Sequence, residues 1–128
     1  MSAEQHKATL RRILEGWNTH SLSAMEALAD ELLTTDYVLH DPDIRDLPPG
    51  PEGIKQFARG VLEHMPDIHI TIQDLVAEED RVAGRFTVNS TDASTGKPQS
   101  LQVMSISRFV DGKIAEEWQL GVPNVGWE

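Results

Sequence analysis

The hydrophobic residues of this chain change their spacing once, near Asp67, and this change limits the folds that the chain can adopt. Before Asp67, apolar residues recur every three or four positions, which is the period of an amphipathic helix. After it they alternate with polar residues, as in residues 68–73 (IHITIQ), which is the period of a strand with one buried face. The sequence therefore predicts helices first and an antiparallel sheet second.

Three helices and one short strand are expected before Asp67. Ser2 and Gln5 have the spacing of a capping box at the start of the first helix. Residues 34–40 (TTDYVLH) have the composition of a strand, and Asp41-Pro42 ends it. The third helix starts at Gly50-Pro51-Glu52, with proline at a favourable first position, and ends before Met65-Pro66. The apolar stripes of the three helices are Leu10, Ile13, Leu14 and Trp17; Met25, Leu28, Ala29 and Leu32; and Ile54, Phe57, Ala58, Val61 and Leu62.

Four strands are expected after Asp67, separated by turns at 79–80, 92–97 and 111–112. Asp111-Gly112 is a strong hairpin signal, because both central residues of a type I′ turn need positive φ. The last strand runs from Lys113 to about Leu120. The fold class that follows is α+β, with three N-terminal helices on the concave face of a curved, mixed, mostly antiparallel sheet.

The length of 128 residues suits a single domain covering 1–128, and the net charge is −10. That charge repels phosphate backbones and anionic lipids, so we expect no nucleic-acid partner and no membrane role. The chain has no cysteine, which excludes disulfides and thiolate metal sites. No apolar run approaches a membrane span and the N-terminus lacks a signal-peptide pattern, so the cytoplasm is the expected compartment.

Counting back from the Asp111-Gly112 turn predicts which residues share a face of the sheet. Regular pairing places Arg108 opposite Ala115, Ile106 opposite Glu117, and Met104 opposite Gln119. One face would then carry Met104, Ile106, Glu117 and Gln119, and the other Ser105, Ser107, Phe109, Ile114, Glu116 and Trp118. A β-bulge would shift this assignment by one residue.

Several segments, in order along nearly the whole chain, resemble the SnoaL-like polyketide cyclases. They are residues 37–42 (YVLHDP), 50–54 (GPEGI) followed by Phe57, 65–67 (MPD), 74–82 (DLVAEEDRV) and 108–118 (RFVDGKIAEEW). The resemblance implies the cone-shaped α+β barrel shared with nuclear transport factor 2, ketosteroid isomerase and limonene epoxide hydrolase. It also implies closure of a polyketide ring by intramolecular aldol addition, without metal or organic cofactor.

The resemblance places the catalytic aspartate of the cyclases at Gln119, and glutamine cannot exchange a proton near neutral pH. Glu117, where many relatives have histidine, is the first candidate for the acid and base; the alternative is a solvated carboxylate at a strand end. His40 beside Asp41 is the second candidate, because a histidine near a carboxylate is a tunable proton-transfer group. The alternative for His40 is a hydrogen bond to the loop backbone.

Further residues are candidates for substrate binding. Trp17, Tyr37 and Phe57 would line the pocket or form core, and Gln119 or Tyr37 would donate to an enolate oxygen. Arg85 shares a face with Thr87. In the epoxide hydrolases the two corresponding positions are an Arg and an Asp, and because the Asp is replaced by Thr87 here, the activation of water for epoxide opening is unsupported. A surface ion pair is the simpler interpretation of Arg85. The expected binding set is Gln119, Trp17, Tyr37, Asp41, Phe57, Arg85, Met104 and Ile106.

Two classes of function are open. One is a cofactor-free cyclase or isomerase acting beside a carbonyl group, and the other is a non-catalytic domain that binds a small apolar or aromatic ligand. We expect no metal, since His40, Asp41 and Asp43 lie in one loop without a distant partner. We also expect a homodimer through the outer sheet face carrying Phe109, Ile114 and Trp118, because a monomer rarely exposes so much apolar surface.

Overall fold

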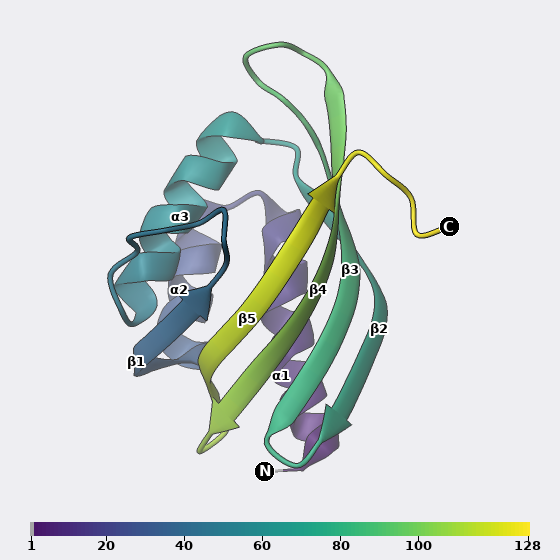
Figure 1. Cartoon of the computed structure of the whole chain (residues 1–128). Coiled ribbons are helices and arrows are strands. Elements are labelled where there is room, and N and C mark those ends of the chain that lie inside the picture. The colour runs from purple at the N-terminus through teal and green to yellow at the C-terminus, as the bar shows by residue number, and fades with distance from the viewer. Residues whose placement is uncertain (1) are drawn as a thin grey trace.

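The computed structural model describes residues 2–128 and consists of three helices beside a single five-stranded sheet (Figure 1). Helix α1 (Ala3–Gly16) runs into a short 3₁₀ turn at Trp17–Thr19. The remaining elements are α2 (Leu22–Leu32), β1 (Leu33–His40), α3 (Pro51–His64), β2 (His69–Glu78), β3 (Arg81–Thr91), β4 (Pro98–Val110) and β5 (Lys113–Pro123). The three helices, the early strand and the four later strands agree with the expectation from periodicity.

The sheet has the strand order β1-β5-β4-β3-β2 and does not close, so β1 and β2 form its edges. Strands β2 to β5 are antiparallel neighbours, and β1 pairs in parallel with β5. The sheet is therefore mixed and mostly antiparallel, as expected. Both residues of the β4–β5 turn have positive φ, 51° for Asp111 and 81° for Gly112, which fits the predicted type I′ hairpin.

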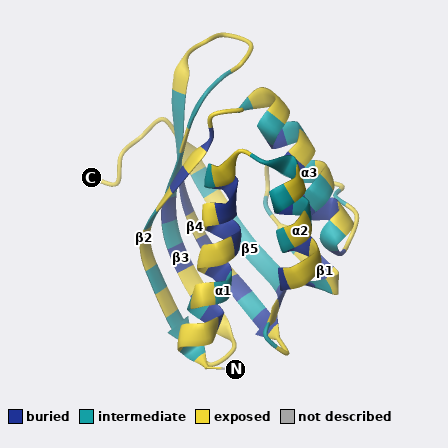
Figure 2. Ribbon diagram, turned by 180° about the vertical axis from the view of Figure 1, so that it is seen from behind, coloured by how far each residue is buried: buried dark blue, intermediate teal, exposed yellow. Residues whose placement is uncertain are grey.

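The helices cover one face of the sheet, here called the inner face (Figures 1 and 2). The other, the outer face, carries no helix, and the C-terminal residues Val125 and Trp127 contact part of it through Gln102, Thr87 and Arg85. The core lies between the helices and the inner face, and its fully buried side chains include Leu10, Met25, Leu33, Val82 and Ile114. The capping box at Ser2 and Gln5 is present and fixes the start of α1. No helix within residues 2–128 is long and apolar enough to cross a membrane.

A β-bulge at Ala115 changes the register of the β4–β5 hairpin. Val110 pairs with Lys113 and Phe109 with Ile114, but Arg108 then pairs with Glu116 and Ser107 with Glu117. The predicted pairing of Ile106 with Glu117 and of Met104 with Gln119 is therefore wrong by one residue. Because of the bulge, two consecutive residues, Ile114 and Ala115, are both buried.

The shifted register moves side chains between faces. Phe109 and Ile114, predicted on the outer face, are buried in the core at 3% and 0% exposure. Met104 and Ile106, predicted beside the pocket, lie on the outer face at 57% and 45% exposure. Ser105 and Ser107 also lie on the inner face, since they pair with Gln119 and Glu117.

Two glycines of α3 provide a test of the packing. A Cβ atom at Gly53 would lie 2.2 Å from the backbone oxygen of Pro48, whereas one at Gly60 would meet nothing within 4 Å. We expect Gly53→Ala to destabilise the protein by about 1–3 kcal/mol through overpacking. Gly60→Ala, on the same helix, should stabilise it by about 0.5–1 kcal/mol, because alanine loses less backbone entropy. Urea unfolding of both variants measures the two changes, and equal effects would contradict this packing.

Candidate functional site

A carboxylate with two hydroxyl partners lies on the inner face of the sheet. The Tyr37 hydroxyl of β1 donates to Glu117 Oε1 of β5 over 2.7 Å. The Ser107 hydroxyl of β4 donates to Glu117 Oε2 over 2.5 Å. Tyr37 and Ser107 are buried, at 3% and 0% exposure, and Glu117 is partly buried. Three neighbouring strands thus hold one carboxylate with both of its oxygens in fixed positions.

Burial raises the pKa of the Glu117 carboxyl above its ordinary value, and the hydrogen bonds from Ser107 and Tyr37 oppose that rise. Burial also raises the pKa of Tyr37 well above its ordinary value, and the neighbouring Glu117 charge adds to the effect. The tyrosine therefore stays a hydrogen-bond donor at neutral pH. Glu117 combines a fixed geometry with a raised pKa, two properties that proton-transfer groups share.

Gln119 is the next residue of β5 on the inner face. Its side-chain Nε2 donates to Asp41 Oδ2 over 2.9 Å. Asp41 follows β1 directly and also accepts from the backbone N–H of Asp43 through its other oxygen. The structure thus brings together two residues of the expected binding set, Gln119 and Asp41, and the amide holds the start of the loop that follows β1.

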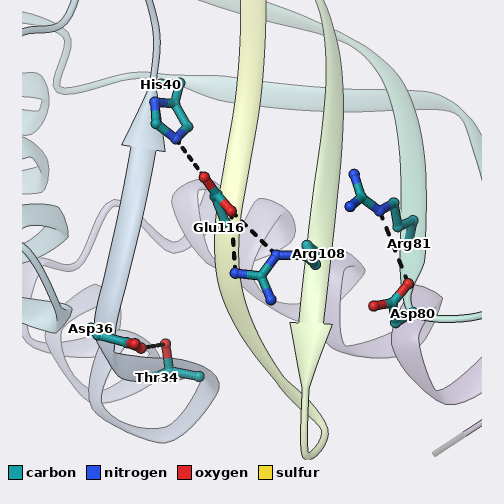
Figure 3. A network of polar contacts seen from close by, with 7 residues as sticks. All are labelled: Thr34, Asp36, His40, Asp80, Arg81, Arg108 and Glu116. Carbon is teal, nitrogen blue, oxygen red and sulfur yellow. Dashed lines mark hydrogen bonds and ion pairs between the residues drawn. The ribbon is translucent and has the colours of Figure 1, made fainter.

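His40 lies on the outer face, away from Glu117. Its Nε2 is 2.7 Å from Glu116 Oε2, and the Arg108 guanidinium contacts the other oxygen of Glu116 over 3.2 Å (Figure 3). The hydrogen bonds from His40 and Arg108 hold the pKa of Glu116 below its ordinary value. His40 and Glu117 are therefore not brought together, and His40 takes part in a surface ion network instead.

The other candidate residues fall into two groups. Trp17 and Phe57 pack edge to face on the inner side, with ring centroids 6.0 Å apart. Arg85 lies on the outer side, where it forms an ion pair of 2.7 Å with Asp74, as the simpler interpretation expected. Met104 and Ile106 line a groove whose wall also includes His40, Asp41, Trp118 and Gln119. Across residues 2–128, no group of three or more His, Asp or Glu residues is placed to hold a metal ion.

Ser107 is the residue of this candidate site that sequence analysis missed. It is fully buried and its hydroxyl is committed to Glu117. The predicted register had placed it on the outer face, opposite to the pocket. A buried serine in an apolar strand is a signal for a polar partner, but only the correct register identifies that partner.

The amino-acid sequence matches the SnoaL-like domain over residues 10–117, which is most of the 128-residue chain. The chain belongs to the SnoaL-like family. Its open mixed sheet with three helices is accordingly the cone-shaped α+β fold that the resemblance implied. No curated protein matches the sequence significantly.

Several solved structures are similar to this SnoaL-like protein. AclR from Streptomyces galilaeus, provisionally assigned as a hydroxylase, is 29% identical, with 96% of this chain and 81% of AclR covered and a TM-score of 0.76. IdmH from Streptomyces antibioticus, provisionally assigned as a polyketide cyclase, is 28% identical, with 91% of each chain covered and a TM-score of 0.75. A protein from Bacillus cereus, also provisionally assigned as a polyketide cyclase, is 26% identical, with 94% of this chain and 78% of the Bacillus cereus protein covered and a TM-score of 0.76.

The family and these neighbours support the expectation that this SnoaL-like protein is a small-molecule pocket protein of the cyclase or isomerase type. Within that type, the chain has a glutamine at the position where the resemblance implies the catalytic aspartate. The carboxylate nearest to that position on the same strand and face is Glu117.

Proposed function

We propose that this protein is a cofactor-free aldol cyclase or isomerase that moves a proton beside a carbonyl group, with Glu117 as its acid and base. The observation that carries the proposal is the hydrogen-bonded, partly buried carboxylate of Glu117 between Tyr37 and Ser107. Its raised pKa brings the carboxyl closer to neutrality, where a general base is most effective. We further propose that residues 1–128 form one SnoaL-like domain.

In the proposed reaction, ionised Glu117 removes a proton from the carbon next to a substrate carbonyl. The resulting enolate carbon attacks a second carbonyl of the same molecule, so that one C–C bond forms and the attacked C=O becomes an alkoxide. The proton on Glu117 then returns to the alkoxide oxygen, and no co-reactant is consumed. An amide has two N–H groups, so Gln119 keeps one N–H for the enolate oxygen beside the one that it donates to Asp41.

A non-catalytic binding domain is the second candidate, and the Gln119–Asp41 contact is the observation that favours it. Gln119 cannot titrate, and its amide is engaged with the loop after β1. Both oxygens of Glu117 already accept hydrogen bonds. A site with these groups could hold a neutral ligand without changing it.

Exchange of substrate protons for deuterium separates the two candidates. A catalytic Glu117 should exchange the α-protons of simple ketones in D₂O faster than buffer does, with a rate that rises as pH passes through the raised pKa of Glu117. NMR follows the loss of the α-proton signal. Ligand binding without accelerated exchange, at any pH from mildly acidic to mildly basic, would favour the binding domain.

Removal of the Tyr37 hydroxyl should shift the pH dependence of this exchange without abolishing it. Tyr37→Phe deletes a hydrogen bond that favours the ionised carboxylate, so the pKa of Glu117 should rise further and the pH profile should shift to higher pH. We expect exchange near neutral pH to slow about tenfold, the effect of one hydrogen bond to a charged group. Ser94→Ala is the matched control, because it removes a hydroxyl that donates to a carboxylate, Asp92, far from the site. An unshifted profile in Tyr37→Phe would contradict the role of Tyr37.

We also propose that the protein forms a homodimer through the outer face of its sheet, with Trp118 buried between the subunits. The outer face carries exposed apolar side chains over β4 and β5, which are Met104, Ile106, Leu120 and Val122. Phe109 and Ile114, which sequence analysis had assigned to this interface, are core residues instead.

A further inference from the structure

A cavity of about 210 Å³ lies between β1, α3 and the segment that joins them. The joining segment, residues 41–50, is called the β1–α3 loop. Most of the cavity wall is aliphatic, and its polar members are Tyr37 and Asp46. The full lining is Tyr37, Val38, Leu39, Ile44, Asp46, Leu47, Pro48, Pro49, Gly53 and Ile54.

The β1–α3 loop is fastened at both ends. At its start, Asp41 accepts from Gln119 and forms an isolated bridge with Ile44. At its end, the backbone N–H of Gly50 donates to the carbonyl of Tyr37 over 2.8 Å, with Gly50 at a φ of 81° that favours glycine. Two prolines before Gly50 restrict the backbone further. A loop that is held in this way keeps the cavity open instead of collapsing into it.

Tyr37 connects this cavity to the proposed acid and base. The residue lines the cavity, and its hydroxyl donates to Glu117. A molecule in the cavity therefore touches the tyrosine that positions the carboxylate. The proton-transfer steps themselves involve Glu117, Tyr37 and Gln119 and leave the cavity free for another part of the substrate.

We infer that the cavity under the β1–α3 loop binds the apolar ring or alkyl end of an uncharged carbonyl substrate, and that Leu47 and Ile44 limit its size. This inference rests on the proposed function for the reactive end of that substrate. A cavity of roughly 150 Å³ is enough to bind benzene in an engineered protein, so about 210 Å³ accepts one six-membered ring. The exposed carboxylate of Asp46 at the wall disfavours an anionic end.

Cyclohexanone and acetone are the probes, because both are uncharged ketones with α-protons and only cyclohexanone has a ring. Leu47→Trp should fill the cavity and raise the dissociation constant of cyclohexanone about tenfold, equal to about 1.4 kcal/mol. The effect on exchange of acetone α-protons should be much smaller than the effect on cyclohexanone, because acetone has no ring to place in the cavity. Val76→Trp adds the same ring at an exposed position of β2 and serves as the control. Ile44→Phe replaces Leu47→Trp if the larger substitution prevents folding.

Ligand-observed NMR measures cyclohexanone binding independently of exchange. Unchanged cyclohexanone affinity in both cavity variants overturns the cavity inference, even where Glu117→Gln stops exchange and the proposed function stands. An equal loss for acetone and cyclohexanone also overturns it, since size would then play no part. Cyclohexanone binding that depends on Leu47 without any exchange supports the cavity as a ligand site and overturns the proposed chemistry.

Discussion

Replacement of Glu117 by glutamine is expected to slow ketone proton exchange by a factor of about 10²–10⁴, the usual contribution of a general base. Glutamine keeps the size of the side chain and can still accept hydrogen bonds from Tyr37 or Ser107, whose hydroxyls rotate to suit an amide. Only the ability to carry a proton is lost. Ligand affinity should therefore change little while the exchange rate, measured by NMR in D₂O, falls.

Glu116→Gln is the matched control for this experiment. Glu116 is the preceding residue of β5, but it lies on the outer face, bonded to His40 and Arg108 (Figure 3). The substitution Glu116→Gln therefore removes one negative charge from the neighbouring residue and changes no side chain of the inner face. Full exchange activity in Glu117→Gln, or an equal loss in both variants, would remove Glu117 from the proposed role.

Glu117→Gln should also change how stability depends on pH. Because burial raises the pKa of Glu117 in the folded state, the folded protein holds this proton more tightly than the unfolded chain. The resulting stability is complete below the ordinary glutamate pKa of about 4.3, and it is lost as pH rises through the raised value. Glutamine at this position does not titrate, so the variant does not lose this stability. As the pH rises from acidic to basic, the free energy of unfolding of the variant should therefore increase relative to that of the native protein. Urea unfolding at both ends of the range measures the difference.

The fold could be predicted from sequence because its signals are local and repeated. The helical stripes before Asp67, the alternation after it and the Asp111-Gly112 turn each describe short stretches of chain. Each of them agrees with the others on one architecture. The position of the single early strand beside β5 was not predicted, since no local pattern specifies a parallel partner strand about 80 residues away.

The site was harder to predict because it depends on register. Ala115 is small enough to be buried beside Ile114, and alternation alone does not reveal that two consecutive residues point inward. Because the prediction did not include this bulge, it assigned Met104 and Ile106 to the inner face and Ser107 to the outer face. Glu117 was nevertheless expected on the inner face, although the partner assigned to it was Ile106 and the structure pairs it with Ser107.

The same register determines which side chains lie on the outer face, and Trp118 is the largest of those on β5. Arg81 and His40 contact the two sides of Trp118, at 5.4 Å and 5.5 Å from its ring centre. Ile106, which pairs with this tryptophan, and Met104 and Leu120, next along the two strands, are exposed and apolar. A net charge of −10 acts against self-association, but the arginines of this face, Arg81, Arg85 and Arg108, form ion pairs with Asp80, Asp74 and Glu116, so these pairs add no net charge to it. A second copy related by a two-fold axis would bring the apolar strips of β4 and β5 together.

Leu120→Asp is therefore expected to dissociate the proposed dimer. Leu120 is 59% exposed and lies opposite Met104 in the β4–β5 ladder, so the substitution leaves the core intact. In the dimer, the new carboxylate would be buried without a partner, at a cost of about 3–5 kcal/mol. The dimer dissociation constant should rise by a factor of about 10²–10⁴.

Sedimentation equilibrium over a concentration series measures that constant. Ala93→Asp adds the same charge to the exposed β3–β4 loop, away from the outer face, and should leave the dimer as it is. A native protein that is monomeric at micromolar concentration would rule out the dimer. A Leu120→Asp variant with the native dissociation constant would move the interface elsewhere, since no packed contact between two sheets tolerates an unpaired carboxylate at its centre.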